Sequence, residues 1–110
     1  MSSTIAQTEA DLQAAVMELA RRCGWRVAHF RPARTDGGWR TAVSGEGAGF
    51  PDLVMVRGKS LLIVELKSAT GRLSAAQGEW VLALGAAGAD MRVWSPDDWP
   101  EIETTLKVRR

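Results

Sequence analysis

The run Leu61-Leu62-Ile63-Val64 constrains the fold more than any other part of this 110-residue chain. Four successive apolar residues place apolar side chains on both faces of a strand, which is typical of a strand in the middle of a sheet. The Gly58-Lys59 pair just before it suits a two-residue antiparallel turn. We therefore expect strands over 51–57 and 60–67, joined as a tight central hairpin.

The other expected elements lie on both sides of this hairpin. Helices are expected over 8–23, 74–87 and about 96–106, and further strands over 25–30 and 91–95. Thr8 and Ser74 are the candidate N-caps, while Gly24 and Gly88 end their helices. The resulting order αβββαβα predicts an α/β (α+β) fold, with a mixed central β-sheet flanked by helices, in one domain over 1–110.

Charge is unevenly distributed, although the net charge is only +1. One stretch holds six arginines against a single acidic residue, Asp36: Arg21, Arg22, Arg26, Arg31, Arg34 and Arg40. Acidic residues gather later in the chain: Asp90, Asp97, Asp98, Glu101 and Glu103. A basic stretch on a near-neutral protein favours a polyanion over a membrane as partner, with a solvated arginine-rich loop as the equal alternative.

Much of the basic stretch falls in the polar segment 31–49, which is expected to be one long loop and, at this length, functional or mobile. We expect Arg31, Arg34 and Arg40 to contact a phosphate backbone there, and Trp39 to stack on a base or sugar. His29 ends the strand before the loop. Its alternatives are packing, which we favour, and a phosphate contact. The other four tryptophans fall in expected elements and are assigned to the core or an interface.

Several functional classes are excluded by what the chain lacks. Cys23 is the only cysteine and His29 the only histidine, so a disulfide framework, a thiolate zinc site and paired-histidine zinc sites are ruled out within one chain. No P-loop, dinucleotide fingerprint or hydrolase triad is present. No apolar run is long enough to span a bilayer and no signal-peptide pattern opens the sequence, so a reducing cytosolic setting is expected.

The hairpin register brings two carboxylates together. With Gly58 and Lys59 as the turn, Asp52 faces Glu65, and their Cβ atoms are expected about 5 Å apart. Like charges directly opposite each other destabilise a hairpin unless something compensates. Mg²⁺ or Mn²⁺ is the natural compensation, because such ions are held by one or two carboxylates plus water and phosphate.

Three more polar residues are directed toward this pair. Lys67 shares a strand face with Glu65, where it could orient a water or stabilise phosphate charge. A solvated Glu65–Lys67 ion pair at a frayed strand end is the alternative, and the facing Asp52 argues against it. Glu9 lies on the apolar stripe of the first helix, either at the site or as a helix-dipole partner. Gln77 lies on the stripe of the second helix and also completes a capping box with Ser74.

These motifs resemble a known nuclease family. Gly49-Phe50-Pro51-Asp52, then Glu65-Leu66-Lys67, then 71–77 (GRLSAAQ) are similar to the virus-type replication-repair nuclease (VRR-NUC) domain of the PD-(D/E)XK superfamily. Thr8-Glu9, Gly24-Trp25, His29-Phe30-Arg31 and Trp94-Ser95-Pro96 look like its small phage and prophage members. The resemblance covers about 8–106 and departs from the family only in the long loop. It implies a restriction-endonuclease-like core.

The resemblance also implies roles for individual residues. Asp52 and Glu65 would bind Mg²⁺ or Mn²⁺ with the Leu66 carbonyl, and Glu9 would act in the metal shell directly or through water. Lys67 would position and activate the attacking water, and Gln77 would steady that arrangement. The implied activity is metal-dependent hydrolysis of DNA phosphodiester bonds, structure-specific toward Holliday junctions or flaps.

The resemblance further implies a homodimer, and a cytoplasmic setting, which is the bacterial host cytosol if the chain is phage- or prophage-encoded. From its mixture of large aromatic and acidic residues, we expect the interface at Trp94, Trp99 and the last helix, with a monomer that nicks one strand as the competing outcome. Two alternatives to a nuclease stay open. One is a catalytically silent nucleic-acid-binding module on the same fold, which the intact Asp52, Glu65 and Lys67 argue against. The other is a protein-interaction domain whose carboxylates form a surface ion network.

Overall fold

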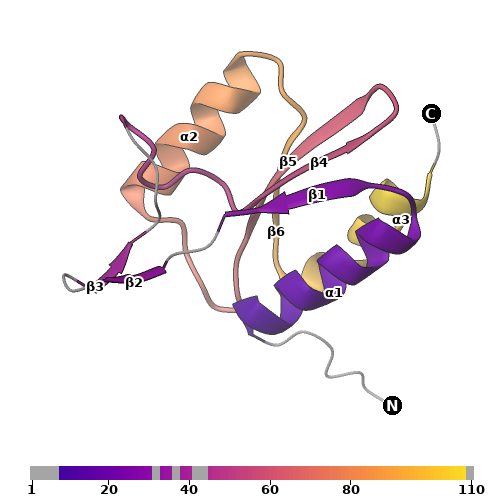
Figure 1. Ribbon diagram of the computed structural model, residues 1–110, viewed down its shortest axis with the longest axis horizontal. Coiled ribbons are helices and arrows are strands. Elements are labelled where there is room, and N and C mark those ends of the chain that lie inside the picture. Colours follow the sequence, from indigo (N-terminus) through magenta and orange to yellow (C-terminus); the bar gives the residue numbers. More distant parts are fainter. Residues whose placement is uncertain (1–7, 31–32, 36–37, 41–44, 109–110) are drawn as a thin grey trace.

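The computed structural model describes residues 8–30, 33–35, 38–40 and 45–108, and only the backbone of 33–35 and 38–40. The helices are α1 (Glu9–Arg22), α2 (Ala75–Ala86) and α3 (Trp99–Lys107), and a short 3₁₀ turn, Pro96–Asp98, leads into α3. The main strands are β1 (Arg26–His29), β4 (Leu53–Arg57), β5 (Ser60–Leu66) and β6 (Met91–Trp94). These are the α/β fold and the order αβββαβα expected from the sequence, with helices around a mixed sheet (Figure 1).

The four main strands form one sheet in the order β1-β4-β5-β6. β1 and β4 are antiparallel, β4 and β5 are antiparallel, and β5 and β6 are parallel. β5 is therefore an inner strand, and its residues from Leu62 to Leu66 are all buried. The central position predicted from the apolar run is confirmed.

The apolar core lies between the sheet and the pair α1–α3. Its members come from both helices, from three strands and from the segment before β1: Leu12, Val16, Ala20, Trp25, Leu53, Met55, Leu62, Val64, Leu66, Trp94, Ile102 and Leu106. Figure 1 shows α2 apart from α1 and α3, on the other side of the strands. Among the described helices, α2 alone has no fully buried residue, so the apolar stripe expected on it is covered only in part.

The helix ends follow the expected chemistry. The Thr8 hydroxyl accepts a hydrogen bond from the Asp11 N–H and begins α1, and Gly24, at a φ of 90°, ends it. Ser74 and Gln77 form a complete capping box at the start of α2. This box fixes the first turn of α2 in place, which matters because Gln77 is a candidate site residue.

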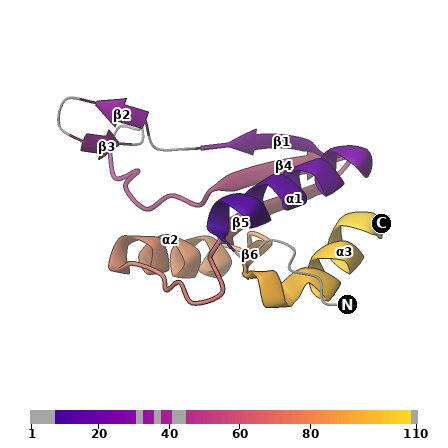
Figure 2. The same cartoon turned by 90° about the horizontal axis from the view of Figure 1, so that it is seen from below.

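The segment 31–49 is not one uninterrupted loop, and this expectation was wrong. β2 (Ala33–Thr35) and β3 (Gly38–Arg40) pair antiparallel as a separate two-stranded sheet. The two residues between them are Asp36-Gly37, a pair typical of tight hairpins, and this signal was overlooked. Figure 2 shows the β2–β3 hairpin standing off one end of the main sheet, far from α3.

The interface expected at Trp94, Trp99 and the last helix is also wrong in part. Trp94 is 1% exposed within the chain's own core, and its indole N–H donates to Glu101. Trp99 is half-buried against the same core. Large aromatic residues near the end of the chain therefore complete the monomer core, and Trp94 is not available to a partner.

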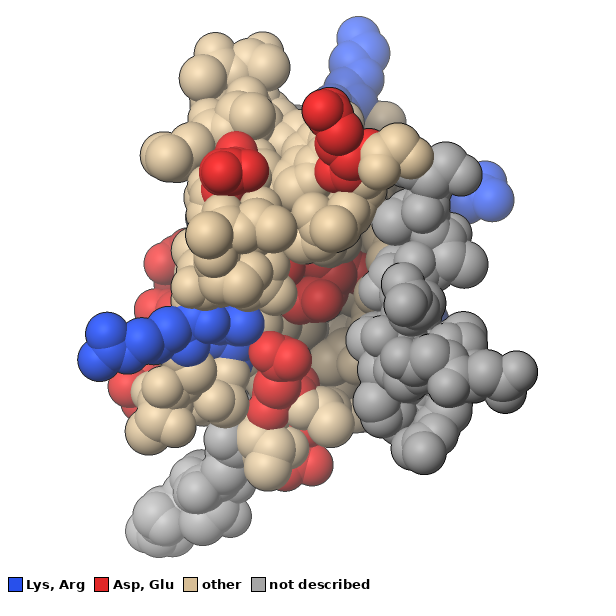
Figure 3. Space-filling view, turned by 90° about the vertical axis from the view of Figure 1, so that its left-hand side faces the viewer, with Lys and Arg blue, Asp and Glu red and all other residues tan. Residues whose placement is uncertain are grey.

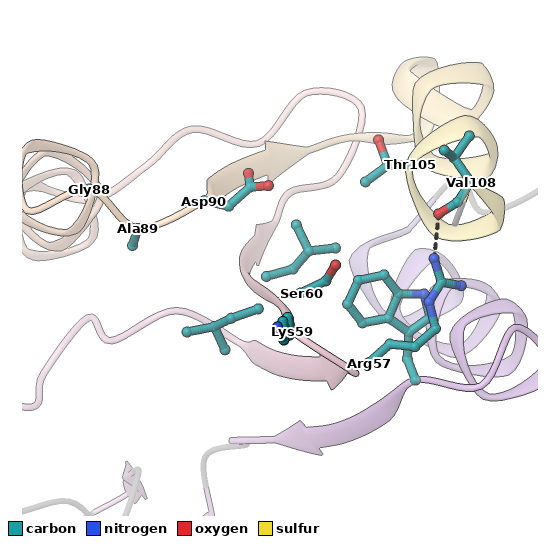
Figure 4. A pocket seen from close by; sticks show the side chains of 11 residues that line it. Arg57, Lys59, Ser60, Gly88, Ala89, Asp90, Thr105 and Val108 are labelled. Carbon is teal, nitrogen blue, oxygen red and sulfur yellow. Dashed lines mark hydrogen bonds between the residues drawn. The ribbon is translucent and has the colours of Figure 1, made fainter. Parts of the chain in front are cut away.

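Arg57, next to the turn of the β4–β5 hairpin, connects that end of the hairpin to α1 and α3. Its guanidinium lies 4.5 Å from the centre of the Trp25 ring and donates to the backbone carbonyls of Cys23 and Leu106. It also donates to the carbonyl of Val108, the bond drawn in Figure 4. These carbonyls belong to the C-terminal ends of α1 and α3, where helices leave acceptors without partners. A pocket of about 520 Å³ lies beside this contact and is lined by neither Asp52 nor Glu65.

Arg57→Met is therefore expected to lower the free energy of unfolding by about 2–4 kcal/mol, since several charge-assisted hydrogen bonds to helix ends are lost. Urea denaturation measures the loss. Arg26→Met on neighbouring β1, where the arginine is exposed, is the matched control and is expected to change stability little. Equal unfolding free energies for the two variants would contradict this role.

Candidate active site

Asp52 and Glu65 stand opposite each other at the end of the hairpin away from its turn. Leu53 pairs with Val64 in the register of β4 and β5, so the preceding residue, Asp52, faces Glu65. The Asp52 carboxylate accepts a hydrogen bond from the Leu66 N–H at 2.9 Å. The backbone carbonyl of Asp52 accepts another from the Phe30 N–H at 2.9 Å. The predicted opposition is confirmed, and backbone contacts from two neighbouring strands hold Asp52 in place.

Glu65 is an unsatisfied buried acid. Its side chain is 1% exposed, and neither carboxylate oxygen has a hydrogen-bond partner among the described residues. Burial, and secondarily the negative charge of Asp52, raise the pKa of Glu65 to about 8 against the opposing attraction of Lys67. Burial also raises the pKa of Asp52, although the Leu66 N–H and Lys67 oppose it. Such a pair costs folding energy unless a cation or a proton compensates.

Lys67 reaches the same place from the end of β5. Its ammonium lies 3.9 Å from a Glu65 carboxylate oxygen and 3.8 Å from that of Glu9. It donates to the Arg72 carbonyl at 3.2 Å and to Gln77 Oε1 at 3.3 Å. The Lys67 side chain is only 14% exposed, so its ammonium is fixed by these contacts and is not a solvated group at a frayed strand end.

Gln77 holds Lys67 from α2 and serves two purposes at once. Its Oε1 accepts from the Ser74 N–H at 2.8 Å as part of the capping box, and the same atom accepts from Lys67. The box thereby fixes the amide in one orientation toward the ammonium. The two roles considered for Gln77 are therefore compatible.

Glu9 approaches from the first turn of α1, with its side chain 51% exposed. Its carboxylate forms an ion pair with Lys67 and so reaches the site through that ammonium. The described residues contain no cluster of three or more His, Cys, Asp or Glu side chains suited to one metal ion.

The donor set nevertheless fits a hard divalent cation. Figure 3, which looks onto the end of the sheet opposite the β4–β5 turn, shows acidic side chains gathered around a hollow. Two carboxylates face each other here, and both oxygens of one of them, Glu65, are buried without a hydrogen-bond partner among the described residues. They match Mg²⁺ or Mn²⁺, which take one or two carboxylates and complete their shell with water and phosphate. The orphaned Glu65 oxygens are the observation that favours such an ion.

The expected nucleic-acid contacts are placed only in part. His29 pairs with Leu53, whose side chain is in the core, so His29 shares a sheet face with Leu53 and not with Glu65. Arg31 lies outside the described residues. Arg34, Trp39 and Arg40 are placed by backbone alone, on the β2–β3 hairpin, where Arg34 pairs with Trp39. The hairpin belongs to the connection that leads into Asp52.

Sequence reasoning missed the contacts that lock the segment before Asp52 to α2. Phe50 packs edge-on against Phe30 and against Trp80, with ring centres 5.6 and 5.0 Å apart. The Trp80 indole N–H donates to the Glu46 carbonyl at 3.1 Å. Gly49, at a φ of 82°, lies directly against the first turn of α2. The motif Gly49-Phe50-Pro51-Asp52 was the available signal, but it does not say what the glycine contacts.

Comparison with known families matches residues 7–95 of this chain to the VRR-NUC domain. The match covers every candidate site residue described above. No curated protein matches the chain significantly. In the described part of the chain, no helix has both the length and the apolar character needed to cross a bilayer.

Proposed function

This chain belongs to the VRR-NUC family, a nuclease domain of the PD-(D/E)XK type, and from that premise we propose that it is a divalent-metal-dependent DNA endonuclease. The proposed substrate is branched DNA, such as a Holliday junction or a flap. The observation that carries the proposal is that Asp52 faces the buried Glu65, whose oxygens have no hydrogen-bond partner among the described residues, beside Lys67. Such an arrangement is costly to a fold, and a cation with a phosphate ligand relieves the cost.

Asp52 and Glu65 are the residues proposed to hold Mg²⁺ or Mn²⁺, with the Leu66 carbonyl as a further donor and Glu9 acting through water. When bound, such an ion supplies Lewis-acid stabilisation of phosphoryl charge and lowers the pKa of a coordinated water. Negative charge on the carboxylates opposes the entry of a phosphate, so DNA binding is expected to depend on the cation that neutralises it.

Lys67 is proposed to orient the attacking water and to stabilise the extra negative charge on the phosphate. Its ammonium has three hydrogens, and the Arg72 carbonyl and Gln77 engage it from one side. The same ammonium lies 3.9 Å from Glu65 and 3.8 Å from Glu9, which supports this role. In the proposed reaction the water oxygen attacks phosphorus in line and gives up a proton to bulk water. The bond from phosphorus to the leaving sugar oxygen breaks, and that oxygen takes a proton from bulk water.

DNA contact is assigned to the basic residues of the connection between β1 and Asp52. Replacing Arg31, Arg34 and Arg40 together by Gln is expected to weaken DNA binding across all sequences, because phosphate contacts carry no base information. The slope of log affinity against log salt should fall by about 2–3, or roughly one per lost contact. Fluorescence anisotropy over a salt series measures both. If affinity and slope both stay unchanged, the three arginines do not contact DNA and belong to a solvated loop.

The activity is tested on labelled linear, flap, splayed and four-way DNA with Mg²⁺, with Mn²⁺ and with EDTA. The proposal expects metal-dependent cuts, with branched substrates preferred over linear duplex. Binding without cutting under every metal condition would instead support the silent nucleic-acid-binding module. Equal cutting of linear and branched DNA would remove the structure-specific part and leave the nuclease.

The chain is further proposed to act as a homodimer, because symmetric cleavage of a junction needs two active sites related by a two-fold axis. Light scattering at micromolar concentration is expected to give about twice the 11.9 kDa mass of one chain. A single-chain mass in the absence of DNA would reject the preformed dimer. The paired-cut mechanism would be rejected with it, unless DNA assembles the two copies.

A further inference from the structure

Gly49 approaches α2 more closely than any larger residue could. A Cβ atom at this position would lie 2.7 Å from both the carbonyl carbon and the Cβ of Ala76, and 2.8 Å from the backbone nitrogen of Gln77. These atoms are backbone or Cβ, so none of them can rotate away as the end of a long side chain can. The φ of 82° adds a backbone cost for any residue with a side chain.

The segment around Gly49 is fastened to α2 on both sides of the contact. Before it, the Glu46 carbonyl accepts from the Trp80 indole, and after it, Phe50 packs edge-on against the same ring. The Phe50 N–H also donates to the Gly47 carbonyl at 3.0 Å. A side chain at position 49 therefore cannot be relieved by a free shift of the loop, and it must displace the first turn of α2 or break these contacts.

Each side of the contact carries part of the site. Asp52 follows Gly49 by three residues, and the Gln77 nitrogen is itself one of the atoms in contact. Gln77 Oε1 then holds the Lys67 ammonium, which lies 3.9 Å from Glu65. The separation between the loop and the helix therefore sets where the ammonium stands relative to the two carboxylates.

We propose that Gly49 is a positioning residue: its missing side chain sets the distance between α2 and the Asp52 segment, and through Gln77 it places Lys67 at the carboxylate pair. The catalytic reading of this role rests on the proposed nuclease function. The placement itself does not, because it is a property of the folded chain without substrate. Gly71, four residues after Lys67 in the sequence, has a different surrounding, since the three atoms nearest to a Cβ there all belong to Ser68 and none to α2.

Gly49→Ala tests the proposal, and Gly45→Ala is its matched control. Gly45 has a φ of 67°, and a Cβ added there would meet nothing within 4 Å, so it carries the same kind of backbone cost without the contact. Gly49→Ala is expected to lower kcat about tenfold or more with little change in KM, since small displacements of reacting groups are expensive. Gly45→Ala is expected to stay within about twofold of the parent. Equal kcat values for the two variants would overturn the proposal.

A double-mutant cycle separates positioning from general damage. Gly49→Ala and Gln77→Ala are expected to disturb the same support of Lys67, so the double variant should have nearly the kcat of Gln77→Ala alone. If the kcat losses of the two single variants multiply in the double variant, Gly49 does not act through Gln77 and Lys67. If Gly49→Ala does not fold, Ala76→Gly loosens the same contact from the helix side, with Ala83→Gly as control for a glycine in α2. The double variant of Ala76→Gly and Gln77→Ala must then also have nearly the kcat of Gln77→Ala alone.

Amide NMR shifts supply a readout independent of cleavage. Gly49→Ala is expected to move the resonances of Ser74, Gln77 and Lys67, whereas Gly45→Ala is not. These shifts decide the placement even if the parent protein cuts no DNA, in which case the proposed function fails and the positioning role still stands. Unmoved resonances at all three residues in a folded Gly49→Ala protein would overturn the positioning role itself.

Discussion

Replacing Asp52 by Asn is expected to lower metal-dependent DNA cleavage by about 10³-fold or more, because the divalent ion supplies several kcal/mol of transition-state stabilisation. The substitution preserves the fold, since the Asn carbonyl oxygen can still accept the hydrogen bond that the Leu66 N–H gives to Asp52. It also removes one of two like charges that face each other, so the metal-free variant should melt no lower than the parent. Loss of activity without loss of stability is the expected signature.

The same variant separates metal binding from catalysis. At a metal concentration one hundred times the Kd, binding adds about 2.7 kcal/mol to the stability of the parent, which corresponds to a rise in melting temperature of about 10 °C or more. Asp52→Asn should lose most of that rise. Asp97→Asn, which neutralises an exposed acid in the 3₁₀ turn before α3, is the charge-matched control and should keep both the rise and the activity. Full cleavage activity in Asp52→Asn would contradict the assignment of a metal site to Asp52 and Glu65.

Glu65 is expected to make the metal-free protein less stable as the pH rises. Its pKa is about 8 in the folded chain against an ordinary value of 4.5, so the folded state binds the proton more tightly than the unfolded state does. The stability that this proton contributes is complete below about pH 4.5 and is lost as the pH rises toward 8. Each pKa unit corresponds to about 1.4 kcal/mol, so the full loss is of the order of several kcal/mol.

Glu65→Gln should flatten this pH dependence. The variant is expected to be clearly more stable than the parent at pH 8 in EDTA and to approach the parent at pH 4.5, because Gln carries no charge at either pH. The raised pKa of Asp52 acts in the same direction, so a smaller slope remains in the variant. At pH 8, Mg²⁺ or Mn²⁺ should restore the free energy of unfolding of the parent and leave that of Glu65→Gln unchanged. Urea denaturation from about pH 4.5 to about pH 8.5 measures all of this, and parallel curves for the two proteins would contradict it.

The central hairpin was predictable because two local rules act together on it. The period of two fixes which side chains share a face, and the two-residue turn at Gly58-Lys59 fixes the register. Asp52 opposite Glu65 follows from these rules without knowledge of the rest of the chain. The Ser74–Gln77 capping box is equally local, and it too was predictable from the sequence.

Contacts between distant segments were not predictable from local rules. The spacing of apolar residues marks Trp94 as large and apolar, but only the packing of α3 decides that it faces the core and not a partner. Likewise, the carbonyl partner that Arg57 finds at Leu106 is 49 residues away along the chain. The close approach of Gly49 to α2 belongs to the same class, since a glycine in a motif indicates a tight place without naming the other surface.

The packing of α1 against α3 also governs how this chain reaches its folded state. The Trp25 indole N–H donates to the Leu106 carbonyl, across 81 residues, and Leu12 and Val16 share one core with Ile102 and Leu106. Contacts so far apart in sequence form late, because a long loop must close before they contribute. The β4–β5 hairpin can form early, and α1 can cover part of its core face, but the rest of that face stays uncovered until α3 has left the ribosome. Among the described elements, the emergence of α3 therefore sets how long the hairpin face stays open to aggregation.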